Sequence, residues 1–295
     1  MRSLAVLAPL VLCASACGSP PAQLPQETAR QTEASWLAAA QGHAAAAGAL
    51  LDEQFEWTDS RGQTRNRDES LASLPALAAN LQGQSNTRSY GYDQLEVLTG
   101  ERPGARFMRV WARRPQGWRL FAMIETASAA AAPQPFSPTM SGPALDCGNP
   151  CRDIPFNPES PAQQEMVAIF EQLKVDEWHP NPERWAPYVL DDVYYVTSAV
   201  SMSKADRVTR LTQQRDSGAA AVPGDPVLTM RIVEFGQSAV MLARHAPYRG
   251  GKPYYSVRVL AHRDGRWQLA NTQQTVIEAA DPVAAVTPRL QDPVP

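Results

Sequence analysis

The stretch Arg109-Val-Trp-Ala-Arg-Arg-Pro-Gln-Gly-Trp-Arg-Leu-Phe-Ala-Met-Ile-Glu-Thr126 aligns without a gap on Arg258-Val-Leu-Ala-His-Arg-Asp-Gly-Arg-Trp-Gln-Leu-Ala-Asn-Thr-Gln-Gln-Thr275. Seven of the 18 aligned positions are identical. Upstream, Leu51-Asp-Glu-Gln-Phe-Glu-Trp-Thr58 parallels Leu190-Asp-Asp-Val-Tyr-Tyr-Val-Thr197, so the separation of the two copies grows from 139 to 149 residues. Units this far apart are tandem domains, because solenoid repeats run roughly 20–50 residues. The sequence therefore predicts two related domains, the second longer by about ten residues.

The composition excludes a strongly basic nucleic-acid binder. The 295 residues are 44% hydrophobic and 19% charged, with 27 Lys and Arg against 30 Asp and Glu and a formal net charge of −3. Proteins hold the phosphate backbone mainly through clusters of Lys and Arg, and no basic run occurs in this sequence. We therefore expect no nucleic-acid partner.

Copy one is predicted to place helices before its strands. Apolar residues recur at three- and four-residue spacing from Trp36 to Leu51, which is typical of a helix. Asn66 and Glu69 have the spacing of a capping box and open a second helix. Strands are expected at about 87–98, 105–114 and 117–126.

Copy two repeats this scheme. Met166 and Phe170 mark its first helix, and Ser203 with Asp206 repeats the capping-box spacing. Strands are expected at about 226–235, 238–247, 253–263 and 266–277. Asp264-Gly265 is a strong turn signal between the last two strands.

This order of elements resembles the nuclear-transport-factor-2-like, or SnoaL-like, cone fold. The segments Val110-Trp-Ala-Arg-Arg-Pro-Gln-Gly-Trp-Arg-Leu120 and Arg263-Asp-Gly-Arg-Trp-Gln-Leu269 are similar to the final hairpin of that family. The resemblance implies an α+β fold with two tandem cone-shaped domains, each with helices packed on a curved antiparallel sheet around a cavity. Members of the family include isomerases, dehydratases and cyclases as well as proteins that only bind, so the fold does not settle the activity.

The N-terminal residues have the pattern of a secretory signal. Arg2 precedes an apolar run over residues 4–12, which is shorter than the roughly 20 residues that span a membrane. Ala14-Ser15-Ala16-Cys17 resembles a bacterial lipobox, which implies that Cys17 is lipidated and that the protein lies in the periplasm or at the outer membrane. The alternative is ordinary cleavage after Ala16, which would leave Cys17 as a free thiol.

The predicted layout has six parts. They are a signal peptide at 1–16, a tether at 17–26, domain one at 27–128, a stiff Pro-rich linker at 129–160, domain two at 161–280 and a tail at 281–295. The linker carries Cys147 and Cys151, for which we favour a structural disulfide in an oxidising compartment. Redox catalysis is the alternative, although its usual motif has two intervening residues instead of three.

The last strands of the two copies differ on one face. On the face marked by Trp118, copy one continues with aliphatic side chains, whereas copy two continues from Trp267 with Asn271 and Gln273. Amides on a half-buried face are costly unless they are hydrogen-bonded. Asn271 and Gln273 either bond to neighbouring strands and water, or they line a polar ligand cavity in copy two.

Three further residues are candidates for that cavity. Tyr255 and Arg258 lie on the adjacent strand, but they cannot both face inward in a regular strand because their separation is odd. We rank Arg258 lower, because Arg109 recurs at the matching place. His245 ends another strand, where a hydrogen-bonded structural histidine is the simpler interpretation.

No catalytic constellation can be named. No Asp is placed beside His245 by its spacing, and no metal-binding or phosphate-binding motif occurs. We therefore leave catalytic residues unassigned and expect neither a metal nor a cofactor. The predicted role is noncatalytic binding of a small molecule or an envelope partner, with attachment to the membrane through the lipid and the two domains paired as an internal pseudo-dimer. The alternative is a cofactor-independent isomerase, dehydratase or hydrolase acting in the cavity of domain two.

Overall fold

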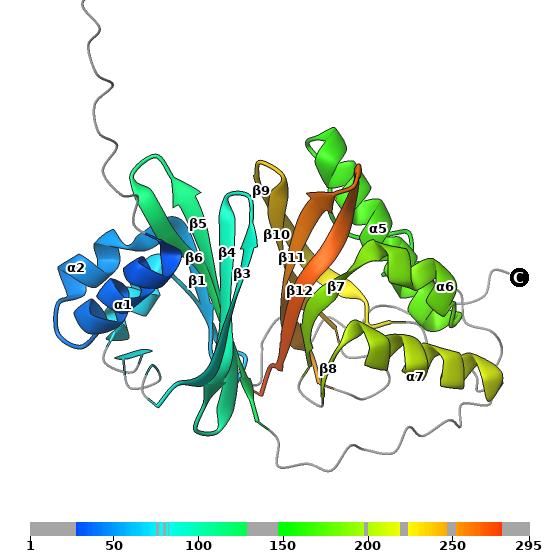
Figure 1. The fold of residues 1–295 in the computed structure, drawn as a ribbon, viewed down its shortest axis with the longest axis horizontal. Coiled ribbons are helices and arrows are strands. Elements are labelled where there is room, and N and C mark those ends of the chain that lie inside the picture. The colour runs from blue at the N-terminus through cyan, green and yellow to red at the C-terminus, as the bar shows by residue number, and fades with distance from the viewer. Residues whose placement is uncertain are drawn as a thin grey trace, which may run out of the picture.

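The computed structural model describes residues 28–278 except 75, 76, 79, 80, 82, 129–146, 198, 199, 219–223 and 247–251. Two six-stranded sheets pack face to face, and the helices cover their outer faces (Figure 1). The predicted α+β class with two tandem units of sheet and helices is confirmed. The signal peptide, the tether with Cys17, residues 129–146 of the linker and the tail lie outside the described residues.

Copy one forms the first sheet. Its elements are α1 (Ala29–Ala40), α2 (Ala44–Ala49), β1 (Leu51–Thr58), β2 (Thr64–Asn66), α3 (Arg67–Ala72), β3 (Ser85–Tyr92), β4 (Leu95–Arg102), β5 (Ala105–Arg114) and β6 (Gly117–Ala127). The strand order is β2-β1-β6-β5-β4-β3. Strands β1 and β6 run parallel, so the sheet is mixed and not antiparallel throughout as predicted.

Copy two forms the second sheet with the same order, β8-β7-β12-β11-β10-β9. Its elements are α5 (Pro161–Trp178), α6 (Pro182–Trp185), the 3₁₀ helix η1 (Ala186–Tyr188), β7 (Val189–Val196), β8 (Ser201–Met202), α7 (Lys204–Asp216), β9 (Val227–Phe235), β10 (Ser238–His245), β11 (Tyr254–Arg263) and β12 (Arg266–Val276). The parallel pair recurs as β7 and β12. The two halves therefore share one topology.

Strand pairing corrects the alignment of the first strands by one residue. Leu51 is paired with Leu120, and Val189 is paired with the equivalent Leu269. Val189, not Leu190, is therefore the counterpart of Leu51. Both segments combine acidic and apolar residues, so the sequence alone does not distinguish the two registers.

The local helix signals are confirmed, but two predicted elements are divided. Asn66 caps α3 and Ser203 caps α7, each with the reciprocal contact of a capping box. The helix expected from Trp36 to Leu51 is interrupted by a turn at Gly42, and β1 begins at Leu51. The strand expected at 87–98 is a hairpin of β3 and β4 that turns at Asp93, whose φ is 48°.

A β-bulge reverses the predicted faces of the last strand in each copy. In β12 the register shifts between Leu269 and Asn271, so Ala270 is the extra residue. Leu269 packs in the core under the helices, whereas Ala270 packs in the core between the sheets. The same shift occurs in β6 at Phe121. A bulge places two residues opposite one on the partner strand, and residues beyond it change face.

The two sheets bury a common apolar core with reciprocal contacts. The Arg114 guanidinium of copy one lies 4.8 Å from the Phe235 ring centroid, and the equivalent Arg263 of copy two lies 5.3 Å from that of Tyr92. Such exchange of equivalent contacts is the rule for two-fold interfaces. The apolar core includes Val97, Val110, Phe121 and Ile124 from copy one and Val240, Val257, Val259 and Ala270 from copy two.

Two further cores lie beneath the helices. In copy two this core includes Ile154 and Phe156, which precede α5. Residues 147–160 therefore differ from the extended linker that we predicted, because apolar side chains hold them against copy two.

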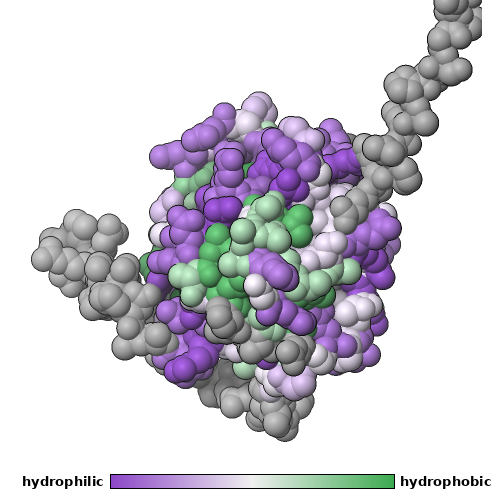
Figure 2. Space-filling model, turned by 90° about the vertical axis from the view of Figure 1, so that its left-hand side faces the viewer, coloured by the Kyte–Doolittle hydropathy of each residue, from purple (hydrophilic) through white to green (hydrophobic). Residues whose placement is uncertain are grey.

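Figure 2 shows the outer face of copy one, where α1 and α2 lie. Hydrophobic side chains gather at the centre of this face among hydrophilic ones. Residues 44–46 of α2 are exposed alanines. Leu228 is the one large hydrophobic residue that is exposed among the described residues. The hydrophobic area on this face therefore consists of small and half-buried side chains. Within the same residues, no helix is both long and apolar enough to cross a bilayer.

Candidate functional site

A small cavity lies in copy two between α5 and the sheet. Its volume is about 20 Å³, which suffices for about one water molecule. The apolar lining consists of Ile169, Phe170, Leu173, Trp185, Met241, Leu260 and Leu269. The other lining residues are Lys174, Glu177, Tyr195, Arg258, Thr272 and Gln274. An apolar pocket with a few converging polar groups is the usual form of a ligand site.

Arg258 lines this cavity without a carboxylate partner. It lies on β11, is only 5% exposed, and donates from Nη1 to Ser256 Oγ. Its guanidinium carbon lies 4.9 Å from the Phe170 ring centroid. Within the described part of the chain, Nη2 has no hydrogen-bond partner. A buried cation is costly unless it is paired, and an anion in the cavity would supply the missing acceptor.

The equivalent residue of copy one, Arg109, is neutralised by the protein itself. Its Nη1 forms an ion pair with Glu33 of α1. The second oxygen of Glu33 accepts a hydrogen bond from Trp111 Nε1 at 2.8 Å. Copy two places the Phe170 ring of α5 against its arginine and no carboxylate. The two copies thus bury an equivalent guanidinium, which has a carboxylate partner in copy one and none among the described residues in copy two.

A second charged group closes one end of the cavity. Glu177 forms ion pairs with Lys174 at 2.8 Å and with Arg207 of α7 at 3.0 Å. Burial raises the pKa of Glu177, but the two cations more than offset it and lower the pKa to about 2. Glu177 is therefore ionised at neutral pH and stays paired within its own cluster.

His245 lies deeper in the same core as a neutral ring. Its Nδ1 is 3.3 Å from the Asp225 carbonyl and its Nε2 is 3.2 Å from Ser256 Oγ. Burial, followed by the charges of Arg258 and Lys174, lowers its pKa well below the usual value. A ring that donates through Nδ1 can accept the Ser256 hydroxyl at Nε2. Both nitrogens are therefore engaged in structural contacts.

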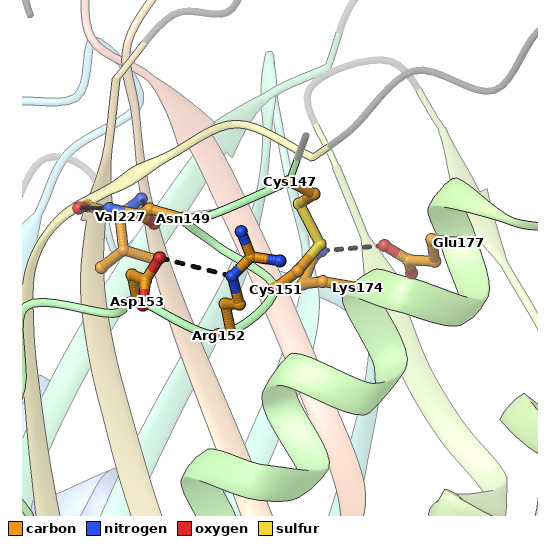
Figure 3. The surroundings of a disulfide bond; sticks show 8 residues. All are labelled: Cys147, Asn149, Cys151, Arg152, Asp153, Lys174, Glu177 and Val227. Atoms are coloured by element: carbon orange, nitrogen blue, oxygen red, sulfur yellow. Dashed lines mark hydrogen bonds and ion pairs between the residues drawn. A yellow bond between two sulfur atoms is a disulfide. The ribbon is translucent and has the colours of Figure 1, made fainter. Parts of the chain in front are cut away.

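A disulfide-closed loop lies beside Lys174 and Glu177 (Figure 3). Cys147 and Cys151 form the predicted disulfide, with their Cα atoms 5.5 Å apart. The Asn149 side chain joins the loop to β9, because it donates to the Val227 carbonyl and accepts from the Val227 amide, each at 2.8 Å. The loop therefore fastens the start of β9 next to the charged end of the cavity.

The structure separates the five predicted ligand residues into two groups. Arg258 and His245 face the core under the helices, as described above. Tyr255 faces copy one and donates to Glu56 at 2.6 Å. Gln273 also faces copy one, and Asn271 lies beside Tyr92 there.

The prediction that Asn271 and Gln273 continue the face of Trp267 is therefore wrong, and the bulge at Ala270 is the reason. Gln273 Nε2 donates to the carbonyls of Arg106 and Ile124 at 3.0 and 3.2 Å. Gln273 therefore stabilises the contact between the sheets, whereas neither polar atom of the buried Asn271 side chain has a hydrogen-bond partner among the described residues. Neither side chain lines the cavity.

Sequence reasoning missed the two helix residues at the cavity. Lys174 and Glu177 continue the face of α5 that carries Phe170 and Leu173. Charged residues at positions that otherwise face the core are the signal that could have identified them. Within the described residues, no group of three or more His, Cys, Asp or Glu could hold a metal ion.

No protein-family model matches this sequence, and no curated protein matches it. The strand order and the helices on one face of each sheet define the architecture. Both copies have the α+β cone fold. We therefore call the core of copy two, with its cavity, the second cone, and that of copy one the first cone.

Solved structures similar to this chain include an NTF2-like protein from Cytophaga hutchinsonii ATCC 33406, at 15% identity and a TM-score of 0.34 over 39% of this chain and 98% of that one. An NTF2-like protein with a cystatin-like fold from Novosphingobium aromaticivorans has 9% identity and a TM-score of 0.34, over 40% and 84% of the two chains. An uncharacterised protein with a cystatin-like fold from Caulobacter vibrioides has 14% identity and a TM-score of 0.33, over 43% and 94%.

Proposed function

We propose that this chain is an exported, lipid-anchored envelope protein that binds ligands without transforming them, and that the second cone is a site for a small anion. The observation that carries the proposal is that Arg258, at the cavity, has no ion pair among the described residues and leaves Nη2 without a hydrogen-bond partner. Arg109 occupies the same position in the first cone and is paired with Glu33. Nη2 lacks a hydrogen-bond partner in both arginines, so what distinguishes Arg258 is the absence of an internal carboxylate among the described residues.

The titratable groups of the second cone support binding better than proton transfer. A general acid or base works best when its pKa lies near the operating pH. The pKa of Glu177 is about 2, and that of His245 lies well below its usual value. Glu177 is held by two cations and His245 by two hydrogen bonds, so neither is poised to exchange a proton with a ligand.

The size of the cavity restricts the ligand. A space of about 20 Å³ accepts a single-atom ion such as chloride when the helices stay in place. Phe170, stacked on the guanidinium at 4.9 Å, leaves the unpaired edge of Arg258 as the point of contact.

Chloride is a suitable probe of this site. We expect chloride to raise the thermal midpoint at constant ionic strength, with bulky gluconate as the balancing anion. At ten times the dissociation constant, the gain is about 1.4 kcal/mol, or about 3–6 °C for a domain of this size. Arg258→Gln should abolish the rise. Arg266→Gln, which removes an exposed arginine of the same copy, should preserve it. An equal rise in the Arg258→Gln variant, or no rise in the wild type, contradicts the proposal.

Anchoring through Cys17 is proposed from the lipobox resemblance of Ala14-Ser15-Ala16-Cys17. We expect the wild-type protein to partition with the membrane fraction of an expressing bacterium. Cys17→Ala should move most of it to the fraction without membranes, because one lipid-modified residue would supply the anchor. Membrane retention that is unchanged by Cys17→Ala argues against the anchor and leaves the anion site untouched.

The pairing of the two copies is part of the same proposal. The face-to-face sheets and their reciprocal contacts support an internal pseudo-dimer. In this arrangement the helices face outwards, because the contact uses only the inner faces of the sheets.

A further inference from the structure

Two grooves run along the edges of the contact between the sheets. On one side, β1 of copy one faces β9 of copy two, and we call this the closed groove. On the other side, β7 of copy two faces β3 of copy one, and we call this the open groove. The open groove has a volume of about 1050 Å³. Because the copies pack reciprocally, each position in one groove has a counterpart in the other.

The closed groove holds a carboxylate of the protein. Glu56 of β1 accepts from Arg231 Nη2 at 2.7 Å and from the Tyr255 hydroxyl at 2.6 Å. Arg231 also donates to Gln54 at 3.1 Å. A carboxylate with a guanidinium and a phenol is a strong, charge-assisted arrangement. The guanidinium of this groove is thereby neutralised by contacts within the chain, and the space left in the groove is about 310 Å³.

Strand pairing identifies the equivalent residues of the open groove. Tyr194 replaces Glu56, since it pairs with Asn271 where Glu56 pairs with Ala122. Arg88 on β3 takes the place of Arg231 on β9.

Arg106 on β5 likewise takes the place of Tyr255 on β11. The open groove thus keeps the arginine of the closed groove, gains a second one and loses the counterpart of Glu56, while Glu101 of β4 also lines it.

The two arginines of the open groove are available to a ligand. Arg88 is exposed, and among the described residues no hydrogen bond or ion pair ties its guanidinium to another side chain. Arg106 makes one ion pair, 3.6 Å from Glu101. Both guanidinium groups act electrostatically on Tyr194, as do Tyr90 and the Glu101 carboxylate that pairs with Arg106. Two cations and one carboxylate therefore surround Tyr194, the counterpart of Glu56, and Arg88 is the cation without an ion pair among the described residues.

The acidic residues on the opposite wall do not fill this place. Asp191 pairs with Lys204 at 2.7 Å, and Asp206 is bound in the capping box of α7. Asp192 is exposed at the position of Gln54, and it makes no ion pair with Arg88 in the described structure. Asp192 would therefore compete only weakly with a ligand carboxylate for the arginines of the open groove.

We infer that the open groove binds a carboxylate-bearing ligand, whose carboxylate lies between Arg88 and Arg106 beside Tyr194. Glu56 in the closed groove is the internal precedent for this ligand group. The width of the groove allows either an organic acid or the free C-terminus of a peptide. This site is separate from the second cone, so it stands or falls independently of the anion proposed there.

Calorimetric titration of the full chain tests the inference. The probes are succinate, trialanine with a free carboxylate, and trialanine amide. We expect the amide to bind at least tenfold more weakly than the acid, because it lacks the charge that the two arginines attract. Stronger binding of trialanine than of succinate would identify a peptide terminus as the source, and the reverse would identify an organic acid.

Variants place the binding in the open groove. Arg88→Gln and Arg106→Gln should each weaken binding of the preferred acid about tenfold. Asp192→Asn should strengthen it. Tyr194→Glu supplies the carboxylate of the closed groove from within the chain, so it should abolish binding. Arg231→Gln is the matched control in the closed groove and should leave binding within about twofold.

Three results would overturn the inference. The first is the absence of binding of both acids to the wild type. The second is equal binding by the wild type, Arg88→Gln and Tyr194→Glu. The third is binding that Arg258→Gln abolishes and Arg88→Gln does not change, which would assign the carboxylate to the second cone.

Discussion

Arg109→Met should lower the free energy of unfolding by about 3–5 kcal/mol, whereas Arg258→Met should leave it unchanged or raise it. The first change leaves the Glu33 carboxylate buried with only Trp111 as its partner. The second removes a buried cation that has no carboxylate beside it and adds apolar contact with Phe170. Urea unfolding followed by tryptophan fluorescence measures both effects. The two substitutions are chemically identical and occur at equivalent positions, so each serves as the control for the other.

A double variant tests the physical reason for this contrast. Glu33→Leu combined with Arg109→Met removes both charges, and it should recover most of the stability that Arg109→Met loses, because buried pairs can often be exchanged for apolar residues. Destabilisation of similar size in both single methionine variants would show that packing, and not charge pairing, dominates at these positions. Recovery in the double variant would attribute the loss to the unpaired carboxylate.

Acid should destabilise the second cone through Glu177. Its pKa in the folded protein is about 2, against an ordinary value of 4.5. A carboxyl with a lowered folded pKa contributes stability that is fully present above about pH 5 and is lost as the pH falls towards 2. The difference corresponds to about 3 kcal/mol. Urea unfolding between pH 2 and pH 7 should therefore show a free energy of unfolding that decreases steeply below about pH 5. This decrease, the acid limb of the curve, should be shallower in the Glu177→Gln variant.

Glu183→Gln is the control for this titration. Glu183 pairs with Arg215 at 2.9 Å but is exposed, and exposed pairs contribute little, so its acid limb should match that of the wild type. His245 also titrates, because its lowered pKa makes protonation below about pH 6.5 unfavourable in the folded state. The titration of His245 is the same in the wild type, Glu177→Gln and Glu183→Gln. It therefore does not change the differences among their free energies of unfolding. Parallel curves for the wild type and Glu177→Gln would refute the role of Glu177.

The duplication and most strands could be predicted because they depend on local pattern. Trp118 and Trp267 mark equivalent hairpins, and Asn66 and Ser203 cap helices through contacts within four residues. The bulge at Ala270 could not be predicted in this way. An extra residue in a strand leaves the alternation of side chains ambiguous, and the partner strand alone fixes where the phase changes.

The candidate site was harder to predict for a related reason. The recurrence of Arg109 at Arg258 suggests equal structural roles, yet their environments depend on what distant helices place opposite them. Both helices supply an aromatic ring, Trp36 of α1 and Phe170 of α5, but among the described residues only α1 adds a carboxylate, Glu33. The sequence gives no spacing rule for this contact, because helix and strand meet only through tertiary packing.

Fusion of the two copies in one chain has a consequence for the grooves. In a homodimer of identical subunits, a two-fold axis would make both grooves the same, and any residue that fills one would fill the other. Here Glu56 pairs with the arginine of one groove, while its counterpart Tyr194 is free to differ. Covalent linkage thus permits broken symmetry. Contacts between the copies occupy one edge of the molecule, and the residues of the other edge can evolve separately.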